Sequence, residues 1–126
     1  ALASLERYEE AIACYDEVIR WDPEDSDAWG TEGIALCELE KYAEAVQCFD
    51  EAIRLDPEHI DAWYNKGLAL GELEKDAEAV ACYDEAIKLY PEYLLALYGK
   101  GNSLRKLGRD EDAEQCLAKA RELQQC

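Results

Sequence analysis

The chain has 126 residues, a formal net charge of −17 and a single histidine. The acidic charge is concentrated in residues 1–93, which hold 7 lysines and arginines against 25 aspartates and glutamates, or −18. Residues 94–126 hold 6 basic against 5 acidic residues, or +1. Such a field repels phosphates and anionic lipid headgroups and attracts basic partners, so the composition argues against nucleic-acid and membrane binding.

The same pattern of residues recurs every 34 positions. One copy is formed by Trp29, Gly33, Leu36, Ala45, Phe49, Ala52 and Pro57, and the next by Trp63, Gly67, Leu70, Ala79, Tyr83, Ala86 and Pro91. A unit of this length is too short to bury its own apolar face, so the period predicts units that stack on one another. The expected divisions of this single domain are residues 1–25, 26–59, 60–93 and 94–126.

The first division is expected to be a partial unit. Residues 1–5 match residues 35–39, so we expect the end of a first helix, followed by a second helix over residues 9–20. Apolar residues recur there at helical spacing, and Asp22-Pro23 ends the run because a residue before proline is driven out of the helical conformation. Since the chain begins without methionine, we interpret it as a fragment that lacks the start of the first helix.

The complete units are expected to be helix pairs. Over residues 26–59 the pattern predicts a first helix ending near residue 39, a turn near residues 40–41 and a second helix over about residues 43–55. Asp27 and Asp61 stand where first helices begin, and a carboxylate there caps the helix or stabilises its positive end. The last unit replaces the recurring tryptophan, aromatic residue, isoleucine and proline by Leu97, Leu117, Arg121 and Gln125, as expected of a polar terminal repeat.

Glycine recurs in the middle of each predicted first helix, at positions 33, 67 and 101. A glycine there costs about 1 kcal/mol relative to alanine. We therefore expect a close approach, in which the ring of Tyr15, Phe49 or Tyr83 lies directly against a neighbouring backbone.

Four of the six cysteines, Cys14, Cys48, Cys82 and Cys116, occupy equivalent positions in the repeats. Equivalent residues of stacked helices lie about 10 Å apart, which is too far for a disulfide. No pair has the Cys-x-x-Cys spacing, and His59 has no second histidine, so a zinc site is not expected. We interpret these cysteines as small buried apolar residues of a cytoplasmic protein, and Cys126 as a candidate free thiol.

These residues resemble the tetratricopeptide repeat family over the whole chain, with about three and a half repeats. The resemblance implies an all-α fold of antiparallel helix pairs stacked as a right-handed superhelix. It also implies a concave groove, lined by the first helix of each pair, that binds peptide segments or helices of other proteins. One departure is that Glu32, Lys66 and Lys100 stand where the family usually has leucine, and we expect them to loosen the packing between first helices.

The face of each first helix that points away from the recurring tryptophan, glycine and leucine is predicted to line this groove. The candidate binding residues are Asp27, Ile34, Glu38, Asp61, Tyr64, Asn65, Leu68, Glu72, Leu95, Tyr98, Asn102 and Arg105. They predict an apolar floor with acidic residues toward one end and basic ones toward the other. The expected partner is a peptide or helix with apolar anchors and basic flanks. In the alternative interpretation, these residues only pack against adjacent first helices.

A well-known subset of the family clamps the carboxylate at the end of chaperone tails with lysines, asparagines and an arginine. Asn65 matches the central asparagine of that clamp, but the flanking positions hold Gly30, Ile34, Leu95 and Gly99. Because these positions carry no cation, we expect no binding of such tails.

Self-association is the alternative to partner binding, because Tyr8, Ile12, Tyr15 and Ile19 would lose their cover if the opening helix is cut, and uncovered repeat ends tend to stack. An enzyme is not expected, since the chain has no phosphate-binding loop, no Ser-His-Asp set and no cluster of metal ligands, and no cofactor is expected either.

Overall fold

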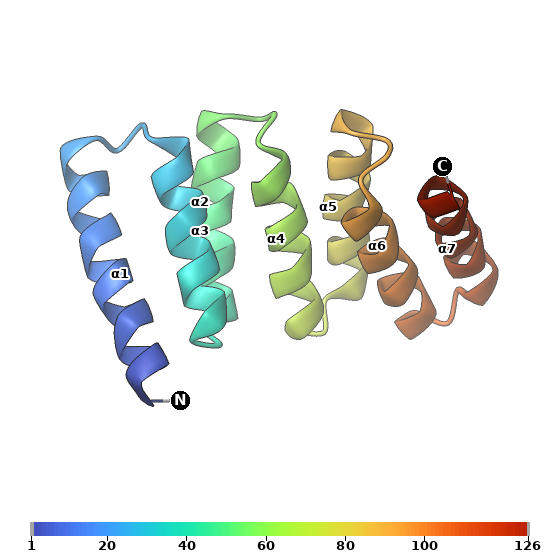
Figure 1. The fold of residues 1–126 in the computed structure, drawn as a ribbon, viewed down its shortest axis with the longest axis horizontal. Coiled ribbons are helices and arrows are strands. Elements are labelled where there is room, and N and C mark those ends of the chain that lie inside the picture. The colour runs from blue at the N-terminus through green and yellow to red at the C-terminus, as the bar shows by residue number, and fades with distance from the viewer. Residues whose placement is uncertain (1, 126) are drawn as a thin grey trace.

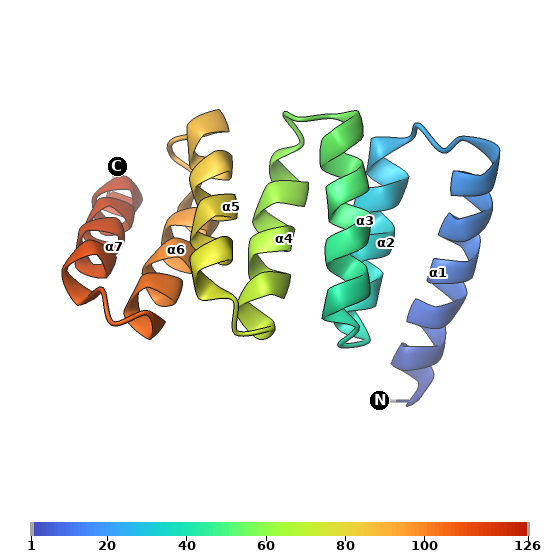
Figure 2. The ribbon, with the colours of Figure 1, turned by 180° about the vertical axis from the view of Figure 1, so that it is seen from behind.

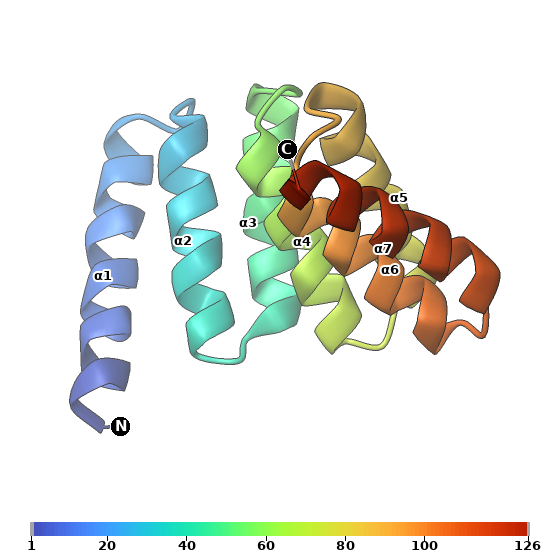
Figure 3. The same ribbon diagram turned by 45° about the vertical axis from the view of Figure 1, so that its right-hand side comes forward.

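A computed structural model describes the backbone of residues 2–125 and the side chains of residues 7–125. Over the described residues the fold is all-α, with seven helices arranged in a row (Figures 1 and 2). The helices are α1 (Leu2–Trp21), α2 (Ser26–Glu38), α3 (Tyr42–Leu55), α4 (Ile60–Glu72), α5 (Asp76–Leu89), α6 (Leu94–Lys106) and α7 (Asp110–Gln125). In Figure 3, α6 and α7 are turned relative to α1 and α2, so the stack twists along its length.

The helices pack in sequential pairs. Helices α2 and α3, α4 and α5, and α6 and α7 form the pairs, and α1, α3 and α5 each pack against the first helix of the next pair. In addition, α2 contacts α4 and α4 contacts α6. The first helices therefore share one side of the stack, as the resemblance implied. None of the helices in the described part of the chain is both long and apolar enough to cross a membrane.

The opening of the chain differs from the expectation. Residues 2–21 form one unbroken helix, α1, in place of the end of a first helix followed by a second one. Residues 2–5 make about one helical turn, which is too short to pack back against a neighbour. Continuing the helix through residues 6–8 keeps the backbone hydrogen bonds that a turn would give up, so the helix extends.

The recurring glycines allow the close approach that was predicted. A Cβ atom built on Gly33 would lie 2.6 Å from Cε1 of Phe49, and one built on Gly67 would lie 2.7 Å from Cε1 of Tyr83. Leu117 approaches Gly101 in the same way, at 2.9 Å. The ring or branched side chain of each second helix thus lies directly on the backbone of its own first helix, where no larger residue fits.

The recurring tryptophan and proline are joined by a hydrogen bond. The indole N–H of Trp29 donates to the carbonyl of Pro23, and that of Trp63 donates to the carbonyl of Pro57, each at 3.0 Å. The two residues therefore fix the loop that enters each first helix. Leu97 stands at the third tryptophan position and has no such donor.

The caps of the first helices correct one expectation. Asp25, not Asp27, caps α2 by accepting from the backbone N–H of Ala28 at 3.2 Å. His59, not Asp61, caps α4 through its Nδ1 atom. Asp27 and Asp61 lie in the first turn instead, where their charge favours the positive end of the helix.

The turn inside each pair is a Schellman motif. The N–H of Lys41 donates to the carbonyl of Leu36 at 2.9 Å, and that of Glu40 donates to the carbonyl of Cys37 at 2.9 Å. The motif needs one residue in the left-handed backbone conformation, and Glu40 and Glu74 adopt it with φ angles of 61° and 62°. The third copy has Gly108 at this position, with φ of 77°.

We expect Glu40→Gly to raise the free energy of unfolding by about 0.5–1 kcal/mol, because glycine adopts this conformation without the strain of a side chain. Gly108→Glu provides the reverse change in the same motif and is expected to lower the free energy of unfolding by a similar amount. Urea denaturation followed by circular dichroism measures both. A destabilised Glu40→Gly variant would show that the glutamate side chain itself holds the turn.

Lys66 and Lys100 each form an ion pair with an aspartate, and their effect on the packing between first helices stays a prediction. Lys66 Nζ lies 2.6 Å from Asp50 Oδ1 of α3, and Lys100 Nζ lies 2.6 Å from Asp84 Oδ1 of α5. Each lysine therefore ties a first helix to the second helix of the preceding pair. These side chains are only partly exposed, so their charges are less screened than those of surface pairs.

The cysteines follow the prediction in the middle of the stack but not at its start. Cys48 and Cys82 are buried, and burial raises the pKa of their thiols to about 12 and about 11. Cys116 is half-buried, whereas Cys14 is exposed, contrary to expectation, because the equivalent face of α1 has no helix over it in the described structure. These four and Cys37 are free thiols, and Cys126 lies outside the described residues.

Candidate functional site

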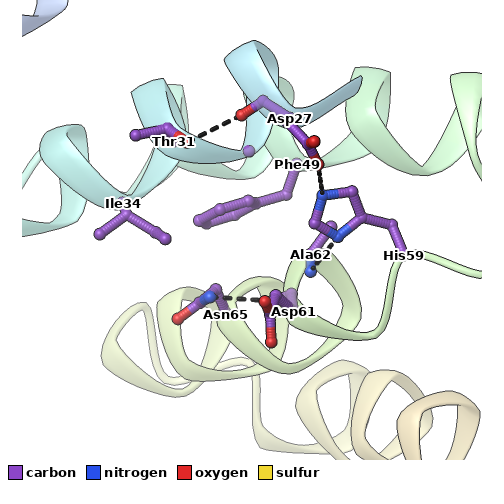
Figure 4. A pocket seen from close by; sticks show the side chains of 9 residues that line it. Asp27, Thr31, Ile34, Phe49, His59, Asp61, Ala62 and Asn65 are labelled. Carbon is purple, nitrogen blue, oxygen red and sulfur yellow. Dashed lines mark hydrogen bonds and ion pairs between the residues drawn. The ribbon is translucent and has the colours of Figure 1, made fainter. Parts of the chain in front are cut away.

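Two adjoining cavities lie between α2 and α4, on the side of the stack shared by the first helices. The smaller cavity, of about 130 Å³, is lined by Asp27, Gly30, Thr31, Ile34, Phe49, His59, Asp61, Ala62 and Asn65 (Figure 4). The larger, of about 370 Å³, is lined by Ile34, Cys37, Glu38, Glu40, Tyr42, Asn65, Leu68, Ala69 and Glu72. Ile34 and Asn65 line both cavities, so the two adjoin, and together they are here called the α2–α4 groove.

His59 fixes one end of the groove. Its Nδ1 accepts from the backbone N–H of Ala62 at 3.2 Å, so the ring proton sits on Nε2, which donates to Asp27 Oδ1 at 3.1 Å (Figure 4). The ring thereby joins the start of α4 to the first turn of α2. His59 was not among the predicted site residues, although the position before each first helix, occupied by Asp25, His59 and Tyr93, is visible in the repeat.

Three apolar side chains of the predicted floor are open to solvent. Ile34 is 41% exposed, Leu68 40% and Leu95 54%, whereas the core side chains of the same helices are nearly fully buried. Packing between adjacent first helices therefore does not account for these residues. Ile34 and Leu68 face the groove from opposite helices.

Acidic side chains surround the apolar floor. Asp27, Glu38, Asp61 and Glu72 are exposed on α2 and α4. The thiol of Cys37 between them has its pKa raised to about 11, first by burial and then by the charges of Glu38 and Glu72. The negative charge of both carboxylates is therefore felt inside the groove, at the Cys37 thiol.

The two predicted tyrosines are engaged within the protein. Tyr64 packs against Tyr83 and Tyr93, with ring centroids 6.0 and 5.4 Å apart, and Tyr98 donates its hydroxyl proton to Gln124 Oε1 at 2.8 Å. Both rings are half-buried, so the alternative interpretation, packing within the protein, applies to them in part. Tyr93 was missed, and burial and the nearby carboxylate of Asp61 raise its pKa.

The α2–α4 groove brings together seven of the twelve predicted residues, namely Asp27, Ile34, Glu38, Asp61, Asn65, Leu68 and Glu72. The other five, Tyr64, Leu95, Tyr98, Asn102 and Arg105, do not line these two cavities. Arg105 on α6 pairs with Glu114 of α7 at 2.9 Å, so its charge is partly neutralised. The Asn65 amide donates to the carbonyl of Asp61 at 2.9 Å and points along its own helix (Figure 4).

The residues predicted for self-association lie on α1. Tyr8, Ile12, Tyr15 and Ile19 are all half-buried, and Ile12 packs against the core formed by α2, α3 and α4. Among the described side chains of α1, the large apolar residues that are exposed are others: Val18 is 41% exposed and Trp21, at the end of the helix, 86%.

Helix pairs that stack in sequence, with their first helices on one shared side, define a helical-repeat protein. Models of the tetratricopeptide repeat match residues 1–25, 14–47, 60–93 and 94–125, and a TPR repeat model matches residues 33–73. The chain belongs to the tetratricopeptide repeat family. Membership implies a scaffold for protein–protein interaction, a role that is generally not enzymatic.

Solved structures share the fold. The crystal structure of MamA is 22% identical with a TM-score of 0.91, over 94% of this chain and 69% of that chain. MamA 41-end from Desulfovibrio magneticus RS-1 is 23% identical with a TM-score of 0.89, over 98% of this chain and 70% of that chain. At these identities the likeness shows the fold alone, and 246 matching chains make the fold too common to indicate one partner. No curated protein gives a significant match.

Proposed function

We propose that the α2–α4 groove binds a peptide segment or helix of a partner protein that carries apolar anchors and basic flanks. The observation that supports this most is the exposure of Ile34 and Leu68 on opposite walls of one groove. Apolar side chains that converge in a concave site and stay open to solvent mark a place where another apolar group is buried.

The length of the groove limits what it holds. Helices α2 and α4 have 13 residues each, and a helix of that length is about 20 Å long. This length fits about six residues of extended chain or about thirteen residues of helix. One or two large apolar side chains of such a segment would reach Ile34 and Leu68.

The carboxylates around the floor select for lysine and arginine in the flanks. Three exposed ion pairs at about 0.5 kcal/mol each would contribute roughly 1.5 kcal/mol, or slightly more than about tenfold in affinity. At 0.1 M ionic strength the Debye length is about 10 Å, and it shortens as the salt concentration rises. The contribution of these exposed ion pairs to the affinity is therefore lost at high salt.

A display library of random peptides, selected against the full chain, tests the proposal. We expect the recovered peptides to combine aliphatic or aromatic residues with lysine or arginine, and their affinity by calorimetry to fall about tenfold between low and high salt. Glu72→Lys is expected to weaken them, whereas the matched charge reversal Glu78→Lys on the second helix α5 is not. Recovery of acidic peptides, or of peptides insensitive to salt, would contradict the proposal.

Self-association is a second candidate function, supported by the incomplete burial of apolar residues on α1. The α3 residues Ala45, Cys48, Phe49 and Ala52 are buried, while their α1 equivalents Ala11, Cys14, Tyr15 and Val18 are half-buried or exposed. A second copy stacked on α1 would cover this face together with Tyr8 and Ile19, whereas Ile12 packs on the core of its own chain. Light scattering that shows a monomer at millimolar concentration would remove this candidate.

A further inference from the structure

The stack contains three joints in which a second helix packs against the next first helix, and each joint is spanned by the same two positions. In the α3–α4 joint Asp50 faces Lys66, and in the α5–α6 joint Asp84 faces Lys100, each at 2.6 Å. In the α1–α2 joint the same positions hold Asp16 and Glu32. The first joint therefore has two carboxyl groups where the others have an ion pair.

Glu32 is well shielded from water. The residue is only 6% exposed, which is rare for a carboxyl group that forms no ion pair in the described structure. Two carboxylates in contact repel each other, and a hydrogen bond between them needs a proton on one of the two. Burial, the hydrogen bond with Asp16 and the charge of Asp16 together raise the pKa of Glu32 to about 8.

Other charged and titratable groups face the same place from the helices packed around Glu32. A cavity of about 440 Å³ beside it is lined by Glu9 and Asp16 from α1, and by Lys41, Glu44 and Cys48 from the start and body of α3. Glu9 and Glu44 add negative charge, and the lysine is exposed at the end of the preceding turn. The buried thiol of Cys48 stays protonated, since its own pKa is raised to about 12.

We propose that the α1–α2 joint is a proton-controlled contact, which holds α1 while Asp16 and Glu32 share a proton and releases it when the pair loses that proton. This property is separate from the groove, because it lies where α1 packs on α2, whereas the groove lies between α2 and α4. Release would uncover the apolar core contact of Ile12, which packs against the cluster containing Leu36 and Cys48.

The direction of the pH dependence follows from the folded and unfolded states. The pKa of Glu32 is raised from 4.5 to about 8 in the folded chain, so the folded joint binds a proton that the unfolded joint does not. The stabilisation that this proton gives to the α1–α2 joint is fully present below pH 4.5. It decreases as the pH rises and is lost once the pH passes about 8. One proton changes the equilibrium by up to about tenfold per pH unit in this window.

Hydrogen exchange of the full chain measures this opening directly. Protection factors, which divide out the intrinsic pH dependence of exchange, are compared for α1 and for α5 between pH 5 and pH 8. We expect protection of α1 to fall by at least about tenfold over this range while protection of α5 stays level.

Three variants test whether the Asp16–Glu32 pair causes the pH dependence of α1 protection. Glu32→Gln keeps the shape and the hydrogen bond without the titration, and Glu32→Lys restores the pairing of the other joints, so both are expected to make α1 protection independent of pH. Lys66→Glu adds a second acid pair, with Asp50, at the α3–α4 joint and should create the same pH dependence there. A flat profile for the unmodified chain, or a slope that survives in both Glu32 variants, would overturn the proposal.

Discussion

Phe49→Ala is expected to lower the free energy of unfolding by about 3–5 kcal/mol. The ring is 0% exposed and belongs to a core cluster shared by α2, α3 and α4. It lies against the bare backbone at Gly33, so on that side no side chain is present to fill the space that its removal leaves. Because a domain is stabilised by only about 5–15 kcal/mol in total, urea denaturation should show a large shift.

The sign of a second substitution tests the same contact. Gly33→Ala is expected to destabilise the unmodified chain, because its Cβ would lie 2.6 Å from the Phe49 ring. In the Phe49→Ala background the same change should stabilise by about 1 kcal/mol, since the space is then open and alanine favours the helix. Equal effects in both backgrounds would show that the ring does not rest on this glycine.

Leu68→Arg is expected to weaken the peptides selected against the groove by at least about 100-fold, or about 2.7 kcal/mol. The substitution removes an apolar anchor and places a cation among the carboxylates that would attract a basic peptide. Leu68 is 40% exposed, so the free energy of unfolding should change by less than about 1 kcal/mol.

Ala81→Arg is the matched control for this prediction. Ala81 is exposed on α5, a second helix, and the substitution changes the net charge by the same amount without touching the groove. We expect it to leave peptide affinity within about twofold. A similar loss in both variants would mean that total charge, not the groove, controls binding.

The fold of residues 26–125 was predictable because the same pattern of residues recurs every 34 positions. Each copy places its apolar residues at helical spacing and a glycine where a ring must approach, and both features appear in the structure at Gly33 and Gly67. The opening helix was not predictable from the same pattern, because residues 2–5 match a helix end but supply too little helix to pack against a neighbour.

The site was predicted in part, for a physical reason. Helical spacing alone shows which residues share a face, and that was enough to identify Ile34 and Leu68 as exposed on the α2–α4 side. It does not show which side chains from the next unit reach that face, so the contacts of Tyr64 with Tyr93 and of His59 with Asp27 were missed.

The lysines show a similar limit. The residues of their own helices, where the family usually has leucine, do not reveal the partners of Lys66 and Lys100. These partners, Asp50 and Asp84, lie on the preceding helices. An alignment of the repeats contains the signal, since the aspartates recur every 34 residues alongside the lysines.

Chemical-shift mapping of a selected peptide on the isotope-labelled full chain tests the central claim most directly. We expect the largest amide perturbations on α2 and α4 around Ile34, Asn65 and Leu68, on both sides of the groove, and their loss in Leu68→Arg. Perturbations confined to α1, or to the outer faces of α3 and α5, would contradict the assignment of the α2–α4 groove as the binding site.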